Sequence, residues 1–452
     1  MTVTILNEVE SKFTLSEEQI KDITKDLMED LEDGLTNEDP NYIGQIPSYV
    51  TALPSGKEVG TYLAIDLGGT NLRTAAVTLH GDGEVGVNMR KYSIPDDIRV
   101  GTATKLFDWI ADCTAELLED TTISAGTANM HMGVTFSFAL DQTAVNRGIV
   151  IKMGKGFDLE GVIGNDLKDM LEDGFQRKNL KIEIAAIIND TVGTLVSHAY
   201  VSPSTRVGLI LATGTNAAYL ESGDKLGKYK GPAVDQMILN TEYSVFGKRL
   251  PRTKYDLELD AVSTIPEFQK LEKMTSGMYM GEIVRRILVD CVNEGALFEG
   301  KMPENLEKPY EFKTLFMSTI EADNSDTLDA VSSIFEKHFP TVEPVSVEER
   351  KTVHKICKLV ASRSANIIGA AISALLLQAN GSTVFLDKDE VTTVGIDGSV
   401  YEFYPYFSHR IRRAMEITLG KERSDRIKLE LARDGGCVGA ALIAMVASTK
   451  QK

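Results

Sequence analysis

The sequence predicts an α/β protein with two similar halves. Two observations support this prediction. Apolar strand-like runs alternate with amphipathic helical stretches along the chain. In addition, the run 63–73 (LAIDLGGTNLR) has a counterpart in 209–221 (LILATGTNAAYLE), and each run breaks into a turn of glycine and hydroxyl residues directly after its strand. A chain with two such strand–turn–strand units is expected to form a cleft with one turn on each wall.

In the first half, the apolar pattern switches repeatedly between the periods of helix and strand. Apolar residues at helical spacing behind a Ser16 or Thr14 cap predict an amphipathic helix over 14–35. The other predicted elements are strands with a hairpin at 81–83 within 61–89, a helix over 102–119, strands over 130–138 and 181–188, and a helix near 163–174. Strands that alternate with helices in this way are typical of mixed or parallel sheets.

The second half follows the same order more loosely. A strand over 206–212 leads into the second glycine turn. Later predicted elements are a helix-rich stretch over roughly 278–380 with a buried apolar helix at 365–377, a strand that ends in 394–405, and a loop feeding a last apolar helix within 434–448. The two halves together fit a duplicated ribonuclease-H-like fold, as in actin-like ATPases, with small and large domains around a central cleft.

This fold predicts the domain boundaries. Residues 1–60 are expected to form an N-terminal helix and an approach segment that packs on the large domain. The small domain is expected over 61–189, together with a C-terminal helix over 437–452, and the large domain over 190–436. A chain of 452 residues is long enough for two or more domains.

Composition excludes several classes of function. A net charge of −18 argues against a nucleic-acid partner, because phosphate backbones require a basic surface. The start, MTVTILNEVE, lacks the apolar core of a signal peptide, and no run of about eighteen apolar residues occurs. We therefore expect a soluble cytoplasmic protein without a membrane partner, and either a monomer or a homodimer. The four cysteines are far apart and show no C-x-x-C spacing, so neither a zinc site nor a disulfide framework is indicated.

The two glycine turns are candidate phosphate loops. Gly68 and Gly69 let the backbone approach an anion without an intervening Cβ, and Thr70 adds a hydroxyl donor. The second turn repeats this chemistry with Gly214 between two threonines, Thr213 and Thr215. A single glycine turn more often only reverses the chain, but two such turns, each after a strand, favour phosphoryl chemistry.

The magnesium and nucleotide predictions follow from these turns. Asp66 ends the first strand and is placed to hold Mg²⁺, directly or through water. The chain contains neither G-x-x-x-x-G-K-[ST] nor a G-x-G-x-x-G that opens a helix after a strand. ATP is therefore expected to bind on a fold other than the P-loop or Rossmann type.

Asp190 is the candidate general base. It lies where the apolar run 184–188 stops, beside Asn189, whose amide can fix a sugar hydroxyl. An Asn-Asp pair after a strand is by itself more often a turn. Its location between the two glycine turns favours the catalytic interpretation, because transfer of a γ-phosphoryl group to an alcohol needs a carboxylate that takes the hydroxyl proton.

A sugar site needs converging donors and acceptors, and the chain supplies several candidates. They are Ser137, Lys155, Asn216, Glu242 and Glu272. Each one alone is more simply interpreted as a strand end, a surface charge or a solvated helix residue. Only their combination indicates a site.

Together these segments resemble the hexokinase family, in the layout of the fungal hexokinases and glucokinases. The resemblance runs from about Pro47 to Ala447, through DLGGTNLR, TFSF, KGF, NDTVGT, TGTNA, NTE-FG, TKYD, EKMTSGMYMGE, IDGSV and GAAL in that order. It implies a small and a large domain that close over a sugar, with ATP and Mg²⁺ as cofactors.

The resemblance also implies roles for individual residues. Asp190 would be the general base and would touch the sugar. The other sugar ligands would be Ser137, Lys155, Asn189, Asn216, Glu242 and Glu272. The nucleotide would lie against Asp66, Gly68, Gly69, Thr70, Asn71, Thr213, Gly214 and Thr215, with Gly398, Ser399 and the loop 434–437 on the adenosine side.

The chain departs from the family pattern mainly in the sugar pocket. Ala139 replaces a proline, Gly154 a threonine and Met153 a tryptophan, and all three changes remove bulk or rigidity. Tyr243 replaces a further tryptophan, and Ser244 replaces a glycine beside Glu242. The usual N-P-G before the second glutamate has become 265–267 (IPE).

These departures suggest a pocket with more room and one added polar group. The natural sugar substituent larger than a hydroxyl is the 2-acetamido group, and fungal hexokinase-like kinases for N-acetylglucosamine are similar at these positions. We therefore expect an ATP-dependent 6-kinase that favours N-acetylglucosamine, with glucose as a weaker or comparable substrate.

Three alternatives stay open. One is an ordinary glucose hexokinase or glucokinase, because Asn216, Glu242 and Glu272 are all present. A second is a hexokinase-like sugar sensor with weak turnover, favoured by the changes at 154 and 243 but opposed by the intact Asp190. The third, a non-sugar ATPase on the same fold, is disfavoured by the full set of sugar-site residues.

Overall fold

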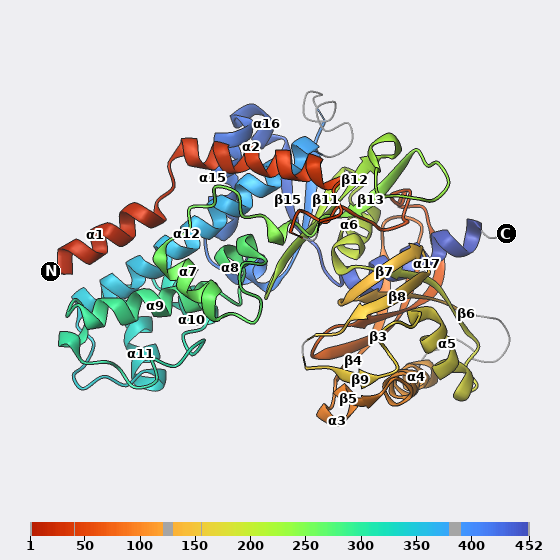
Figure 1. Ribbon diagram of the computed structural model, residues 1–452, viewed down its shortest axis with the longest axis horizontal. Helices are drawn as coiled ribbons and strands as arrows, with labels where there is room; N and C mark the ends of the chain where they lie inside the picture. The colour runs from red at the N-terminus through yellow and green to blue at the C-terminus, as the bar shows by residue number, and fades with distance from the viewer. Residues whose placement is uncertain (1, 40, 121–129, 155, 379–389, 451–452) are drawn as a thin grey trace.

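The structure, a computed structural model, describes residues 2–39, 41–120, 130–154, 156–378 and 390–450. Two bodies lie side by side, each around its own main sheet, and helices cover the sheets (Figure 1). The first body has a five-stranded sheet in the order β10-β6-β2-β3-β4. Its strands are β2 (Val59–Leu67), β3 (Asn71–His80), β4 (Val85–Ser93), β6 (Met130–Phe136) and β10 (Ile182–Ile188).

The second body repeats this topology. Its six-stranded sheet has the order β1-β13-β12-β11-β14-β15. The strands are β1 (Ile46–Pro47), β11 (Thr205–Leu211), β12 (Thr215–Ser222), β13 (Gln236–Asn240), β14 (Thr392–Asp397) and β15 (Ile427–Leu431). In each sheet an antiparallel three-strand meander is followed by two strands that join in parallel. The predicted duplicated ribonuclease-H-like architecture is confirmed.

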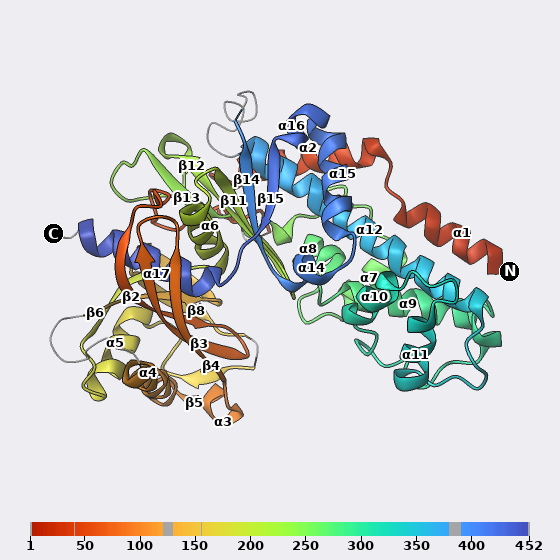
Figure 2. The same ribbon diagram turned by 180° about the vertical axis from the view of Figure 1, so that it is seen from behind.

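Two helices lie between the sheets. The helix α6 (Asp190–Val201) packs on β11, while α17 (Gly435–Lys450) packs on β2, β6 and β10 and crosses α6 (Figure 2). The crossing requires glycine, because a Cβ at Gly439 would lie 2.3 Å from the carbonyl oxygen of Gly193. This close approach brings the first residues of both helices to the same place.

The outer face of the five-stranded sheet is covered by α4 (Ala103–Asp120) and α5 (Leu167–Arg177). Smaller elements complete this body: α3 (Asp96–Arg99), β5 (Val100–Thr102), β7 (Ala139–Ala144), β8 (Arg147–Lys152) and β9 (Asp158–Glu160). Side chains of alternate strand residues face opposite layers: Leu63 and Ile65 pack with α4 and α5, and Ala64 packs with α17.

The second body is mainly helical outside its sheet. The long helix α12 (Val347–Gln378) packs against α2 (Glu17–Gly34), α15 (Phe407–Leu419) and α9 (Met280–Asn293). The remaining helices are α1 (Thr2–Phe13), α7 (Lys254–Val262), α8 (Lys270–Thr275), α10 (Thr314–Ala322), α11 (Asp329–His338), α14 (Ser399–Phe403) and α16 (Lys421–Asp425), with short 3₁₀ turns at Gly223–Lys225, Tyr243–Val245 and Phe298–Gly300.

The helix α12 is long and apolar enough to cross a membrane by length and composition. However, 83% of its most apolar window is buried inside the protein. Its apolar surface therefore belongs to the core, as the sequence predicts for 365–377.

Most predicted elements occur near their predicted positions, but three differences concern the ends of the chain and the sugar loop. The helix predicted over 14–35 is α2, and Ser16 rather than Thr14 caps it through a capping box with Gln19. The helix α1 and the β7–β8 hairpin were not predicted. The last helix begins at Gly435, so most of the predicted loop 434–437 is the first turn of α17.

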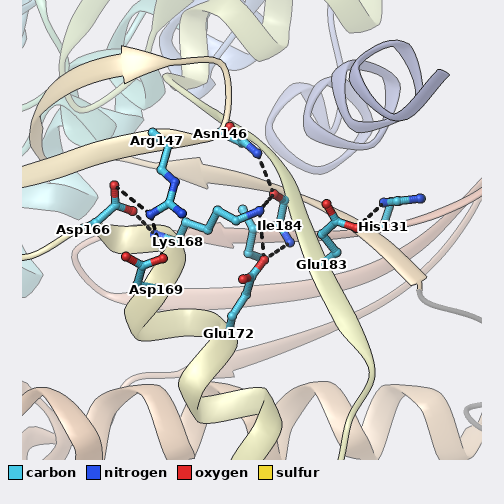
Figure 3. A network of polar contacts seen from close by, with 9 residues as sticks. All are labelled: His131, Asn146, Arg147, Asp166, Lys168, Asp169, Glu172, Glu183 and Ile184. Atoms are coloured by element: carbon cyan, nitrogen blue, oxygen red, sulfur yellow. Dashed lines mark hydrogen bonds and ion pairs between the residues drawn. The ribbon is translucent and has the colours of Figure 1, made fainter. Parts of the chain in front are cut away.

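A side-chain network supports β10, the edge strand that leads to Asp190. The pairing of β10 with β6 shifts register between Ile184 and Ala186. Lys168 Nζ donates to the Ile184 carbonyl at 2.9 Å, and Glu172 Oε1 accepts from the Ile184 N–H at 2.8 Å (Figure 3). Asn146, beyond the end of β7, donates to the same carbonyl. Side chains thus satisfy backbone groups of Ile184 on an edge strand.

Candidate active site

The first glycine turn joins β2 to β3. Gly68 N–H donates to the Asn71 carbonyl at 3.0 Å, which closes the turn over Gly69 and Thr70. Asp66, at the end of β2, is directly opposite Arg73 on β3, and Arg73 Nη1 lies 2.5 Å from Asp66 Oδ2. The turn therefore presents backbone N–H groups, one cation and one carboxylate.

These groups open into a cavity of about 350 Å³ at the junction of the two bodies. Both halves of the chain supply its lining, which comprises Asp66, Gly68, Gly69, Thr70, Asn71, Arg73, Met89, Ser137, Asp190, Thr194, Ile210, Ala212, Asp397, Gly398, Asp434, Gly435, Gly436 and Cys437. The cavity thus brings together the first turn, Ser137, Asp190 and Gly398, which the sequence assigned to one site.

Asp190 is the first residue of α6 and directly follows β10 and Asn189. Asn189 caps the helix, because its Oδ1 accepts from Thr191 N at 2.9 Å and from Thr191 Oγ1 at 2.6 Å. The cap uses the amide oxygen and leaves the amide nitrogen as the group suited to a substrate oxygen. A strand end and a helix cap together fix the position of Asp190 in the cavity.

The N-terminus of α17 forms another part of the cavity lining. Its second residue, Gly436, approaches Asp66 so closely that a Cβ there would lie 3.0 Å from Asp66 Oδ2, and a Cβ at Gly435 would lie 2.8 Å from Thr194 Oγ1. Thr135 Oγ1 donates to the Gly436 carbonyl at 2.8 Å and fixes this turn against β6. Helix N-termini bind anions through their N–H groups, and the arrangement suits the phosphates of a nucleotide.

Asp397 ends β14 on the opposite wall. Burial raises its pKa to about 6, while the Arg73 guanidinium counteracts the shift. The next residue, Gly398, has φ of +139°, and a Cβ there would lie 2.2 Å from the Leu211 carbonyl oxygen. Only glycine fits there, so the turn that follows Asp397 depends on this residue. Ser399 begins α14 and is exposed.

A second polar cluster lies at the end of β13 and the start of β12. Asn216 Nδ2 donates to Asn240 Oδ1 at 2.8 Å and to Glu242 Oε1 at 2.9 Å, and Asn240 Nδ2 donates to the same Glu242 oxygen at 2.9 Å. Burial raises the pKa of Glu242, and the two amides counteract the shift. Glu242 has φ of +52°, a strained conformation for a non-glycine residue and typical of functional sites.

This cluster is close to the helix of the candidate base. Thr191, the residue after Asp190, has its Oγ1 3.5 Å from Asn240 Oδ1. The amides and carboxylates of Asn216, Asn240 and Glu242 offer donors and acceptors of the kind that sugar hydroxyls require.

The second glycine turn joins β11 to β12, and the Glu272 side chain contacts it. Glu272 Oε2 accepts from Thr215 N at 2.9 Å, and a Cβ at Gly214 would lie 2.6 Å from that oxygen. Thr213 is exposed, whereas Thr215 is buried and its hydroxyl donates to the Ile210 carbonyl. The Thr215 hydroxyl is therefore engaged inside the protein.

Of the sequence-predicted residues, the cavity lining contains Asp66, residues 68–71, Ser137, Asp190 and Gly398. Asn189, Asn216, Glu242, Glu272, residues 213–215 and Ser399 are not part of this lining. Lys155 lies outside the described residues. Sequence reasoning assigned no role to Arg73, Asn240 or Asp397, although each lies inside a quoted motif (DLGGTNLR, NTE-FG and IDGSV) and carries a charge or an amide. The described residues contain no group of three or more His, Cys, Asp or Glu side chains that could hold a metal ion.

The sequence and the fold match known proteins over almost the whole chain. Two family models, both described as hexokinase, match residues 5–200 and 206–446. Hexokinase-1 of Schizosaccharomyces pombe is 37% identical over 446 residues, which cover 97% of this chain and 90% of that protein. The chain belongs to the hexokinase family.

Other family members give the same result. Hexokinase-1 of Saccharomyces cerevisiae is 33% identical, with 98% of this chain and 92% of that protein covered. A solved structure of Schistosoma mansoni hexokinase, complexed with glucose, has a TM-score of 0.85 and 34% identity, and covers 99% of this chain and 100% of that one. The family activity is ATP-dependent transfer of a phosphoryl group to a hexose, and this chain is a hexose kinase of that type.

Proposed function

We propose that this hexokinase phosphorylates N-acetylglucosamine at the C6 hydroxyl with ATP, and glucose less well or comparably. The observation that supports kinase chemistry most strongly is the position of Asp190, which shares one cavity with the first glycine turn and with Asp397 from the other body. A carboxylate at that junction can take the proton of a sugar hydroxyl while the turns hold the phosphates.

In this proposal, one set of residues binds the sugar and another binds the nucleotide. Asp190 accepts the C6 hydroxyl proton, while Ser137, Lys155, Asn189, Asn216, Glu242 and Glu272 bind the sugar. The nucleotide lies against Asp66 and residues 68–71, the second turn 213–215, and Gly398 and Ser399. The N-terminus of α17 and the Arg73 guanidinium add positive potential for the phosphates.

The carboxylates of the cavity suit Mg²⁺, which binds oxygen ligands and commonly uses one or two carboxylates together with waters and phosphates. Asp66 would hold the ion, directly or through water. When bound with ATP, the ion would neutralise charge on the phosphates. Asp66 itself fixes Arg73 at the same turn, so carboxylate and guanidinium present a paired surface to the nucleotide.

Two of the residues that depart from the family pattern, Gly154 and Ser244, support the N-acetylglucosamine preference. Gly154 is exposed, and a Cβ added there would meet no atom within 4 Å. Ser244 is buried directly after Tyr243 and adds a hydroxyl near the Glu242 loop. Open space at residue 154 and one added hydroxyl are what an acetamido substituent needs.

We also propose that the two bodies act as the small domain, 61–189 with 437–452, and the large domain, 190–436, with the first 60 residues packed on the latter. Closure of these domains over the sugar would exclude water, which otherwise accepts the phosphoryl group. The enzyme would act as a soluble protein in the cytoplasm.

An ATP-coupled assay with a panel of sugars tests the substrate proposal. We expect kcat/KM for N-acetylglucosamine to equal or exceed that for glucose. A strong glucose preference without N-acetylglucosamine turnover would identify an ordinary hexokinase, and binding of sugar without turnover of any hexose would identify a sensor.

Gly154→Thr provides the matched variant. The backbone at Gly154 does not have a positive φ, so a threonine there introduces no left-handed backbone strain. The added side chain should lower kcat/KM for N-acetylglucosamine by roughly tenfold more than for glucose. Equal losses for the two sugars would show that position 154 does not form the wall beside the acetamido group.

A further inference from the structure

The second glycine turn is supported from behind by a buried tyrosine hydroxyl. Tyr243 directly follows Glu242 and begins a 3₁₀ turn in the core of the second body. Its side chain is fully buried, and its Oη lies 2.5 Å from Thr215 Oγ1. Burial raises the pKa of Tyr243, so the phenol keeps its proton.

The proton positions in this contact follow from the other partner of Thr215. Thr215 Oγ1 donates to the Ile210 carbonyl at 3.0 Å, and a carbonyl can only accept. The single hydroxyl proton of Thr215 is thus used, so Thr215 must accept from Tyr243. The result is a directed chain in which Tyr243 donates to Thr215 and Thr215 donates to Ile210.

A second group from the sugar side holds the same residue. Glu272 Oε2 accepts from the Thr215 N–H at 2.9 Å. The carboxylate lies so close to the turn that a Cβ at Gly214 would be 2.6 Å from the same oxygen. Thr215 is therefore fixed at its backbone by Glu272 and at its side chain by Tyr243. Glu272 and Glu242, the neighbour of Tyr243, are both assigned here to the sugar site.

We propose that Tyr243 is a positioning residue that couples the sugar site to the second phosphate turn. The proposal rests on the assignment of Glu242 and Glu272 to the sugar and of residues 213–215 to ATP. A sugar that orders Glu242 also orders Tyr243 in the adjacent 3₁₀ turn, and the hydroxyl chain transmits that order to Thr215. Because such coupling is reciprocal, ATP must stabilise the sugar complex by the same factor.

Tyr243→Phe tests the coupling by removal of one oxygen atom. We expect kcat/KM for ATP, measured at saturating sugar, to fall roughly tenfold, because Thr215 loses its donor in a buried environment. The sugar Kd without nucleotide, measured by calorimetry, should stay within about twofold. The increase in sugar affinity on addition of a non-hydrolysable ATP analogue should be lost.

Thr215→Val and the double variant identify the path. If Tyr243 acts through the Thr215 hydroxyl, the double variant should lose no more in kcat/KM for ATP than the larger of the two single losses. Additive losses would mean that Tyr243 and Thr215 act independently and would overturn the proposal.

Tyr219→Phe is the matched control. Tyr219 lies on β12, is as deeply buried as Tyr243, and its hydroxyl contacts Gln45 and Glu221 rather than the turn. This variant should lower Tm to a similar degree and leave kcat/KM for ATP unchanged. If both Tyr243→Phe and Tyr219→Phe lower Tm, and neither changes kcat/KM for ATP, then Tyr243 is only a core residue.

Different results would contradict the proposed function and the proposed coupling. The assays use whichever hexose the unmodified enzyme turns over most efficiently. Absence of turnover by the unmodified enzyme would contradict the kinase assignment, whereas active enzyme with unaltered Tyr243→Phe kinetics would contradict only the coupling.

Discussion

Asp66 and Arg73 face each other across the β2–β3 hairpin, and Arg73 Nη1 lies 2.5 Å from Asp66 Oδ2. Seven residues of separation and one glycine turn are enough to set this pair, because antiparallel pairing places the two side chains directly opposite. The Arg73 side chain is 42% exposed and Asp66 only 14%, so the carboxylate positions the guanidinium at the cavity.

Arg73→Met should weaken ATP binding. Loss of the guanidinium removes a cation from the phosphate side of the cavity, and KM for ATP should rise roughly tenfold while the sugar Kd stays unchanged. Steady-state kinetics with each substrate varied will measure this. Arg90→Met is the control, because Arg90 pairs with Glu116 on the outer surface of the same body. Equal effects of the two variants would contradict a specific role of Arg73.

Asp190→Asn should retain sugar binding and lose turnover. An amide keeps the shape of the side chain but cannot accept the hydroxyl proton, so kcat should fall by about 10²–10⁴. Calorimetry with the sugar and kcat with ATP measure the two effects separately. Near-normal kcat in this variant would make Asp190 a structural helix residue only.

Asp397 should make stability depend on pH. Burial raises its pKa from 3.8 to about 6, Asp434, Asp66 and Glu402 add to the shift, and Arg73 opposes it. Between these values the folded protein binds more protons than the unfolded chain. The stabilising contribution is therefore full below pH 3.8 and is lost as the pH rises towards 6.

Asp397→Asn should remove this dependence. The ligand-free variant should gain Tm relative to the unmodified protein at about pH 7, and gain little or lose Tm at about pH 4. Differential scanning calorimetry over this range is the measurement. Asp141→Asn, at an exposed site on β7, is the control and should leave the profile unchanged. Parallel profiles for Asp397→Asn and the unmodified enzyme would contradict the prediction.

Sugar alone, and not ATP alone, should compact the protein. The proposed sugar ligands come from both bodies, with Ser137 on one and Asn216, Glu242 and Glu272 on the other, so sugar favours the closed arrangement. Small-angle scattering should show a smaller radius of gyration with sugar. The fluorescence of Trp109, which packs edge-on against Tyr92 beside the core of the first body, gives a second signal. No compaction with the preferred sugar would contradict closure.

The sequence by itself determined most of the fold and predicted several of the residues that line the cavity. Strand and helix periods are local properties, so β6, β10, α2 and the long apolar helix α12 follow from them. The glycine turns were recognisable as candidate phosphate loops because glycine lets the backbone approach an anion without an intervening Cβ. The paired strand–turn units also indicated the duplicated topology that the two sheets confirm.

Tertiary structure alone decided which groups meet. Asn240, Asp397 and Tyr243 lie in motifs that the sequence shows, but those motifs do not specify their partners, which are far along the chain: Tyr243 meets Thr215 28 residues away. Thr215 illustrates the reverse case. Its sequence suggests a phosphate donor, yet its hydroxyl is buried and donates to Ile210. Hydrogen-bond partners depend on how strands and turns pack together. Local sequence patterns do not specify which residues distant in the chain become neighbours in the fold.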